Sequence, residues 1–156
     1  MISRAWELFW LDEIDKAKEI ALRVWRRTRN QETKARAAFL LAMIESKNGN
    51  INEALEWVNK AIELGLDDAN VYILQARLLM KTKNYAQALK AINRAEKIQI
   101  NEEENVDYEV LFLKAKILSE LGRKEEARQI ITGLLEILAM DDEILALAKE
   151  LGMIID

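Results

Sequence analysis

The stretch that decides the fold is AFLLAMIESKNGNINEALEWVNKAIEL, residues 38–64, because it recurs as YILQARLLMKTKNYAQALKAINRAEKI, residues 72–98. The two copies begin 34 residues apart. A further copy, LFLKAKILSELGRKEEARQIITGLLEI, occupies residues 111–137, which is five residues later than the same period predicts. Self-similarity at a fixed period is typical of a repeat protein, in which each copy is one supersecondary unit.

Two alanines, always twelve residues apart, mark every copy. Where two helices cross, a small side chain lets their axes approach closely, and a bulky one would overpack the contact. We therefore expect two closely packed helices in each copy, including a shortened first one. The alanine pairs are Ala5 and Ala17, Ala42 and Ala54, Ala76 and Ala88, and Ala115 and Ala127.

A turn is expected between the two helices of each copy. Asn48, Gly49 and Asn50 interrupt the apolar pattern of residues 38–64, and Gly49 suits the left-handed conformation that ends a helix. Lys83–Asn84 and Gly122–Arg123 stand at the matching positions of the later copies. The five extra residues are predicted in the connection around 101–105.

These copies resemble the tetratricopeptide repeat, a hairpin of two antiparallel helices with a period of 34 residues. The resemblance covers roughly residues 1–139 and implies an all-α fold, a right-handed α-α superhelix (solenoid) of about three to four helical hairpins plus a C-terminal capping helix. It rests on the signature positions, which are mostly small or apolar and in the second copy are Ala38, Leu41, Ala42, Glu45, Ala54, Val58, Ala61 and Leu66.

We expect one tetratricopeptide-like domain over residues 1–156. Asp141–Asp142 indicates the N-cap of a last helix, and a repeat stack needs such a helix to cover its final apolar face. The hairpins are predicted at about 1–30, 35–66, 69–100 and 106–139, and the capping helix at about 141–153.

Composition excludes most catalytic chemistry. The chain has no histidine and no cysteine, which excludes disulfides, thiol chemistry and triads with a histidine base. It has no phosphate-binding glycine loop, and we expect no carboxylate pair in an apolar setting that raises a pKa. The acidic groups at 102–104 and 141–143 are interpreted as linker and helix-cap residues. We therefore expect no enzyme, no catalytic residue, no cofactor and no metal site.

Charge argues against nucleic acid as a partner. The net charge is −4 and the isoelectric point is near 5.1, whereas a nucleic-acid surface is strongly basic. No segment has the roughly 18 consecutive apolar residues of a membrane span, and the first ten residues do not resemble a signal peptide, so we expect a cytoplasmic location. A basic run is attributed to the helix dipole, which favours cations at a helix C-terminus. The run consists of Arg23, Arg26, Arg27, Arg29, Lys34 and Arg36.

The resemblance implies a concave groove, lined by the first helix of each hairpin, that holds a peptide of a partner protein. Alignment of the copies places cations beside aromatic residues there, and this combination suits a peptide with acidic groups and apolar anchors. The predicted groove residues are Trp6, Trp10, Arg36, Phe39, Met43, Lys47, Asn70, Ile73, Arg77, Lys81, Phe112 and Lys116.

The sequence thus predicts a non-enzymatic scaffold or adaptor that binds a partner peptide. The alternative is a structural module that self-associates, for instance as a homodimer, through its N-terminal aromatic residues or its C-terminal apolar helix. A further alternative is that Trp6, Phe9 and Trp10 only cover the end of the first hairpin and the lysines are ordinary solvated charges. We expect Trp25 and Trp57 to pack between hairpins.

Overall fold

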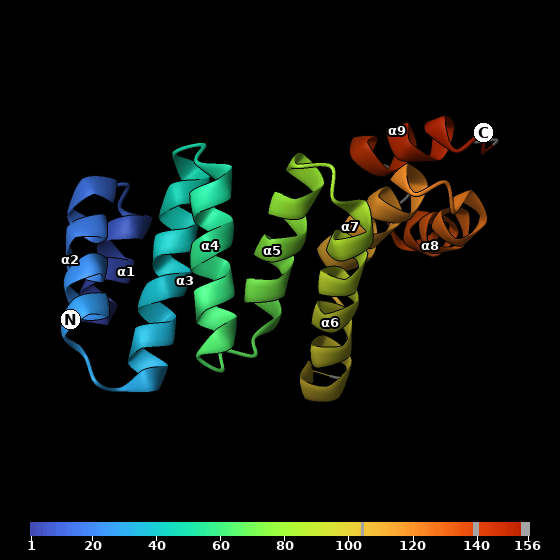
Figure 1. Ribbon diagram of the computed structural model, residues 1–156. Helices are drawn as coiled ribbons and strands as arrows, with labels where there is room; N and C mark the ends of the chain where they lie inside the picture. Colours follow the sequence, from blue (N-terminus) through green and yellow to red (C-terminus); the bar gives the residue numbers. More distant parts are fainter. Residues whose placement is uncertain (104, 139–140, 154–156) are drawn as a thin grey trace. The chain divides into compact units, whose positions relative to one another are not determined.

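The computed structural model describes residues 1–103, 105–138 and 141–153, and this part of the chain contains nine α-helices and no strand (Figure 1). The predicted all-α fold is confirmed. The helices are α1 (Ile2–Trp10), α2 (Ile14–Arg27), α3 (Gln31–Lys47), α4 (Ile51–Glu63), α5 (Ala69–Lys81), α6 (Tyr85–Glu103), α7 (Tyr108–Glu120), α8 (Lys124–Ile137) and α9 (Asp142–Glu150).

The chain divides into two compact units, Met1–Leu78 (unit 1) and Leu79–Asp156 (unit 2), which are described separately. The single domain over residues 1–156 therefore stays a prediction. Three of the alanine pairs lie together in one core cluster each, as their spacing predicts: Ala5 with Ala17, Ala42 with Ala54, and Ala115 with Ala127. All eight alanines of the four pairs are fully buried.

The core of unit 1 forms where α3 packs against its neighbours. Leu40, Leu41 and Ile44 of α3 are fully buried and lie in one cluster with Leu8 and Phe9 of α1. The opposite side of α3 packs on α4 and α5 through a second cluster that contains Ala42, Val58 and Val71. Because α3 is covered on two sides, apolar residues surround much of its circumference.

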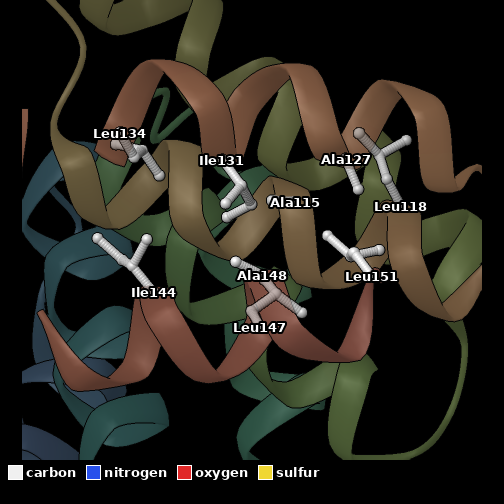
Figure 2. Close-up of a cluster of buried hydrophobic side chains, with 9 residues drawn as sticks. All are labelled: Ala115, Leu118, Ala127, Ile131, Leu134, Ile144, Leu147, Ala148 and Leu151. Atoms are coloured by element: carbon white, nitrogen blue, oxygen red, sulfur yellow. The ribbon is translucent and has the colours of Figure 1, made fainter. Parts of the chain in front are cut away.

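The core of unit 2 joins α7, α8 and α9 (Figure 2). Ile144, Leu147 and Leu151 face Ile131 and Leu134 of α8 and are at most 6% exposed. Arg128 Nε of α8 also donates a hydrogen bond of 2.8 Å to the carbonyl oxygen of Leu151. The C-terminal helix thus packs closely on the preceding hairpin and buries its apolar side chains.

The turns between paired helices share one backbone conformation. Gly49 has a φ of +83°, as predicted for the residue that ends the helix, and Gly122 has a φ of +78°. Asp12 and Lys83 occupy the same position, five residues before the second alanine, with φ values of +64° and +63°. Four turns between consecutive helices therefore use the left-handed region, two of them without glycine.

The extra residues before α7 lengthen a helix as well as its connection. α6 continues to Glu103, beyond the predicted end near residue 100, because residues 85–103 contain no glycine or proline to stop it. Gln99, which is buried, donates to Asp107 Oδ2 and accepts from the Asp107 backbone N–H, both at 3.0 Å. These two bonds connect α6 to the N-cap of α7. No helix in the described ranges is long and apolar enough to cross a membrane.

Candidate peptide-binding surfaces

An aromatic surface lies on α1 and α3 in unit 1; we define it by Trp6, Trp10 and Phe39. The rings of Trp6 and Trp10 stack with centroids 6.4 Å apart and planes inclined by 24°. Trp6 also lies 5.7 Å from the ring of Phe39 on the next hairpin. Residues four apart share a helical face, which explains why Trp6 and Trp10 meet, whereas Phe9 points into the core. Trp10 is 71% exposed, whereas Trp6 and Phe39 are half-buried.

The two predicted cations of this region are paired. Lys47 Nζ lies 2.7 Å from Asp12 Oδ1 in the α1–α2 turn and 5.6 Å from the centroid of the Phe9 ring. Arg36 lies 2.7 Å from Glu32 Oε1, one turn earlier on α3. Each pair is substantially exposed, and exposed pairs contribute about 0–1 kcal/mol, so a carboxylate of a ligand can compete for either cation.

The remaining predicted residues of unit 1 differ in exposure. Met43 is half-buried and packs on the same cluster as Trp6. Asn70 and Arg77 are exposed, and the Asn70 backbone N–H donates to Asp68 Oδ1 at 2.7 Å. Ile73, in contrast, is only 6% exposed. Its side chain belongs to the core and is not part of an exposed surface.

Unit 2 carries the other three predicted residues. Lys116 Nζ lies 5.6 Å from the centroid of the Phe112 ring, one helical turn away on α7. Phe112 is half-buried against the core of unit 2, while Lys81 and Lys116 are exposed. α7 therefore presents a cation beside an aromatic ring, as the sequence predicts for this helix.

Trp25 and Trp57 pack between hairpins, as expected. Their rings meet edge to face with centroids 5.1 Å apart, which joins α2 to α4. Lys60 Nζ lies 4.3 Å from the Trp57 ring, and Lys34 Nζ lies 4.5 Å from the Trp25 ring. The lysines cover the indoles, which accounts for the partial burial of both tryptophans.

A buried carboxylate is the feature that the sequence interpretation missed. Glu45 of α3 is 1% exposed and accepts bonds from Lys18 Nζ at 2.8 Å and from Asn50 Nδ2 at 2.7 Å. Glu53 of α4 also hydrogen-bonds to it. The signal was the position of Glu45 on α3, next to the buried Ile44 and three residues after the fully buried Ala42.

The pKa values of the Glu45 and Glu53 carboxyls shift in opposite directions. Burial raises the pKa of Glu45, but hydrogen bonds from Lys18 and Asn50 outweigh burial and hold it below its ordinary value. The hydrogen bond and charge of Glu45 raise the pKa of Glu53. The raised pKa is that of the exposed Glu53, and its main cause is Glu45 rather than an apolar setting. The fold creates this carboxyl pair by bringing α4 against the end of α3. Among the described residues, no group of three or more carboxylates is placed to hold a metal.

Comparisons with known proteins agree on the fold. The tetratricopeptide-repeat protein YrrB, described as having an unusual peptide-binding site, superposes with a TM-score of 0.83 at 19% identity, over 96% of this chain and 73% of YrrB. PilF of Pseudomonas aeruginosa superposes with a TM-score of 0.80 at 16% identity, over 95% of this chain and 64% of the PilF chain. The N-terminal domain of stress-induced protein-1 from C. elegans superposes with a TM-score of 0.62 at 20% identity, over 80% of this chain and 99% of that domain.

These identities are low, so the structures show a shared helical-repeat fold, which typically serves as a protein-interaction scaffold. No curated protein matches the chain in sequence. A family model does: the one described as anaphase-promoting complex, cyclosome, subunit 3 matches residues 47–134, more than half of the chain. The chain belongs to this family and is a tetratricopeptide-repeat protein.

Proposed function

We propose that this protein is a non-enzymatic scaffold that binds a peptide segment of a partner protein on the aromatic surface of unit 1. The exposure of Trp10 carries the proposal: 71% of this large side chain faces solvent although it stacks on Trp6. Exposed large apolar side chains that gather in one patch mark interaction sites more often than single ones do. Trp6 extends the patch to Phe39, so it spans two hairpins.

The chemistry of the surface favours a peptide with an apolar anchor and an acidic neighbour. An apolar side chain would pack against the indole of Trp10, where burial of aromatic area provides most of the binding free energy. A carboxylate beside it would replace Asp12 as the partner of Lys47, since that exposed pair exchanges at little cost. YrrB, which shares the fold, is described as a peptide-binding protein.

Selection of peptides from a random displayed library on the purified protein tests this proposal. We expect selected sequences to combine an apolar residue with Asp or Glu. Trp10→Ala should weaken their binding roughly tenfold or more, the effect of losing a hot-spot aromatic. Tyr108→Ala is the matched control, because Tyr108 is an exposed aromatic residue of unit 2. Equal affinities for the wild type and Trp10→Ala would reject the surface.

Self-association is the alternative that the exposed N-terminal residues support. Leu11 is 67% exposed next to Trp10, and a second copy of the chain could cover both residues. The route through the C-terminal helix loses support, since Ile144, Leu147 and Leu151 are already buried within unit 2. Sedimentation equilibrium separates the two functions. A dimer that Trp10→Ala dissociates would favour self-association, and a monomer at every concentration would reject it.

A further inference from the structure

Unit 1 contains a cleft of about 410 Å³ at the end of its first hairpin, away from the aromatic surface. Its apolar lining consists of Met1, Ile2 of α1 and Val24 of α2, and its polar lining of Arg23, Arg27, Thr28 and Thr33. The N-terminus, the last turn of α2 and the connection to α3 meet there (Figure 1). Ile2 begins α1 and Trp10 ends it, so about 12 Å of helix separates the cleft from the aromatic surface.

The cleft lies in the most basic part of the sequence. Between Glu19 and Glu32 there are four arginines and no acidic residue, although the whole chain has a net charge of −4. The two flanking glutamates neutralise little of this charge. Glu32 pairs at 2.7 Å with Arg36, which is not a cleft residue, and Glu19 forms only a longer contact of 3.4 Å with Arg23. Positive charge therefore concentrates around the cleft.

The helix dipole explains only part of this charge. It favours cations in the last turn of α2, where Arg26 and Arg27 lie. Arg23 lies one turn further from that end, and Arg29 lies outside the helix. The dipole also gives no reason for an apolar cleft between arginines and two threonines. A ligand that combines carboxylates with an apolar side chain accounts for both features.

We propose that this cleft binds an acidic peptide segment that carries one apolar side chain. The apolar side chain would contact Ile2 and Val24. Carboxylates would form bidentate pairs with the guanidinium groups of Arg23 and Arg27, a geometry that lysine cannot provide. Thr28 Oγ1 accepts from the Asn30 backbone N–H at 3.2 Å, which leaves its hydroxyl proton for a ligand oxygen. This site does not depend on the proposed function of the aromatic surface.

Fluorescence anisotropy with the full chain and defined probes tests the proposal. The probe is a fluorescein-labelled octapeptide with one leucine flanked by aspartates and glutamates; its reference replaces every acid by the matching amide. We expect the acidic peptide to bind and the amide peptide to bind roughly tenfold more weakly or worse, since charge-assisted bonds are lost. Equal binding of the two peptides, or no binding of the acidic one, would overturn the proposal.

Two double variants locate the site. Arg23→Gln with Arg27→Gln removes both cleft arginines, whereas Arg26→Gln with Arg29→Gln removes the same charge from the same segment outside the cleft lining. Each takes one arginine from the last turn of α2, and the first variant also removes the exposed Arg23–Glu19 pair, which contributes about 0–1 kcal/mol. The first should weaken binding roughly tenfold and the second less than about twofold, the remaining effect being long-range attraction. Equal weakening of peptide binding by the two double variants would show a diffuse electrostatic attraction and would overturn the proposed cleft site.

Three further measurements separate loss of the cleft site from unfolding, from nucleic-acid binding and from binding at the aromatic surface. Circular dichroism checks that both variants retain the wild-type helicity; if the cleft variant does not, Thr33→Val replaces it and should also weaken binding. A single-stranded oligonucleotide of equal charge is a competitor, and tighter binding of the oligonucleotide than of the acidic peptide would overturn the proposal in favour of nucleic acid. Trp10→Ala should leave binding at the cleft unchanged, so the two sites can fail separately.

Discussion

Lys18 Nζ lies 2.8 Å from Glu45 Oε1, and this contact joins the first hairpin to the second. Lys18 stays 40% exposed at its side chain, whereas that of Glu45 is 2% exposed. A buried carboxylate is costly unless donors surround it. Here Lys18 comes from α2 and Asn50 from the α3–α4 turn, so the carboxylate of α3 holds three parts of unit 1 together.

Glu45→Gln should destabilise unit 1 by about 1–3 kcal/mol, because the amide loses the charged bond to Lys18. The loss stays below that of a fully buried ion pair, since Lys18 remains in contact with water. Denaturant titration followed by circular dichroism measures the change. Glu56→Gln, an exposed glutamate of α4, is the control and should unfold like the wild type. Coincident curves for Glu45→Gln and the control would show that the contact contributes no stability.

Glu53→Gln should change how stability depends on pH. The pKa of Glu53 is raised above its ordinary value of 4.5 in the folded protein, mainly by its hydrogen bond to Glu45 and then by the charge of Glu45. The folded state therefore binds more protons than the unfolded chain between 4.5 and the raised value. The stability that Glu53 contributes falls as pH rises through this window.

Glu53→Gln removes this loss, because an amide keeps its N–H donors at every pH. The stability of the variant relative to the wild type should therefore increase from pH 4 to pH 7. An opposing effect is smaller: the N-terminus of α4 favours a negative charge, which the variant lacks. Unfolding curves at pH 4, 5.5 and 7 measure the gain. A stability difference that does not vary with pH would mean that Glu45 does not perturb Glu53.

Lys83→Gly should stabilise the protein. Lys83 has a φ of +63°, where a side chain is strained, and the matching turns use Gly49 and Gly122. Relief of this strain outweighs the extra freedom of glycine in the unfolded chain, for a net gain of up to about 1 kcal/mol. Lys90→Gly, in the middle of α6, is the opposite control and should cost about 1 kcal/mol. Thermal unfolding measures both, and a lower melting temperature for Lys83→Gly would contradict the account.

The repeat could be predicted from sequence because it depends on local spacing. The alanine pairs and Gly49 specify where helices pack and turn, and the structure confirms both. Pairing of charges could not be predicted in this way. Periodicity places Lys47 on a helical face, but its partner Asp12 is 35 residues away, and only the packed fold brings the two within 2.7 Å.

The burial of single side chains could not be predicted from the sequence either. Alignment of the copies predicts Ile73 in the groove, yet Ile73 is only 6% exposed, because alignment gives its position on the helix and not which neighbouring side chains cover it. The sequence marks Glu45 only as a signature position of the repeat, and its buried bonds to Lys18 and Asn50 depend on the packed fold. The sequence predicts the aromatic residues of α1 as a group, but which of them faces solvent depends on their contacts with α3.

The central claim, that a partner peptide binds on α1 and α3, is tested most directly by nuclear magnetic resonance. The chain has four tryptophans, so its indole N–H signals provide four probes, each assigned with a single Trp→Phe variant. During titration with a selected peptide, the signals of Trp6 and Trp10 should shift and those of Trp25 and Trp57 should stay in place. Shifts confined to Trp25 and Trp57, or no shift while the peptide binds, would contradict the claim.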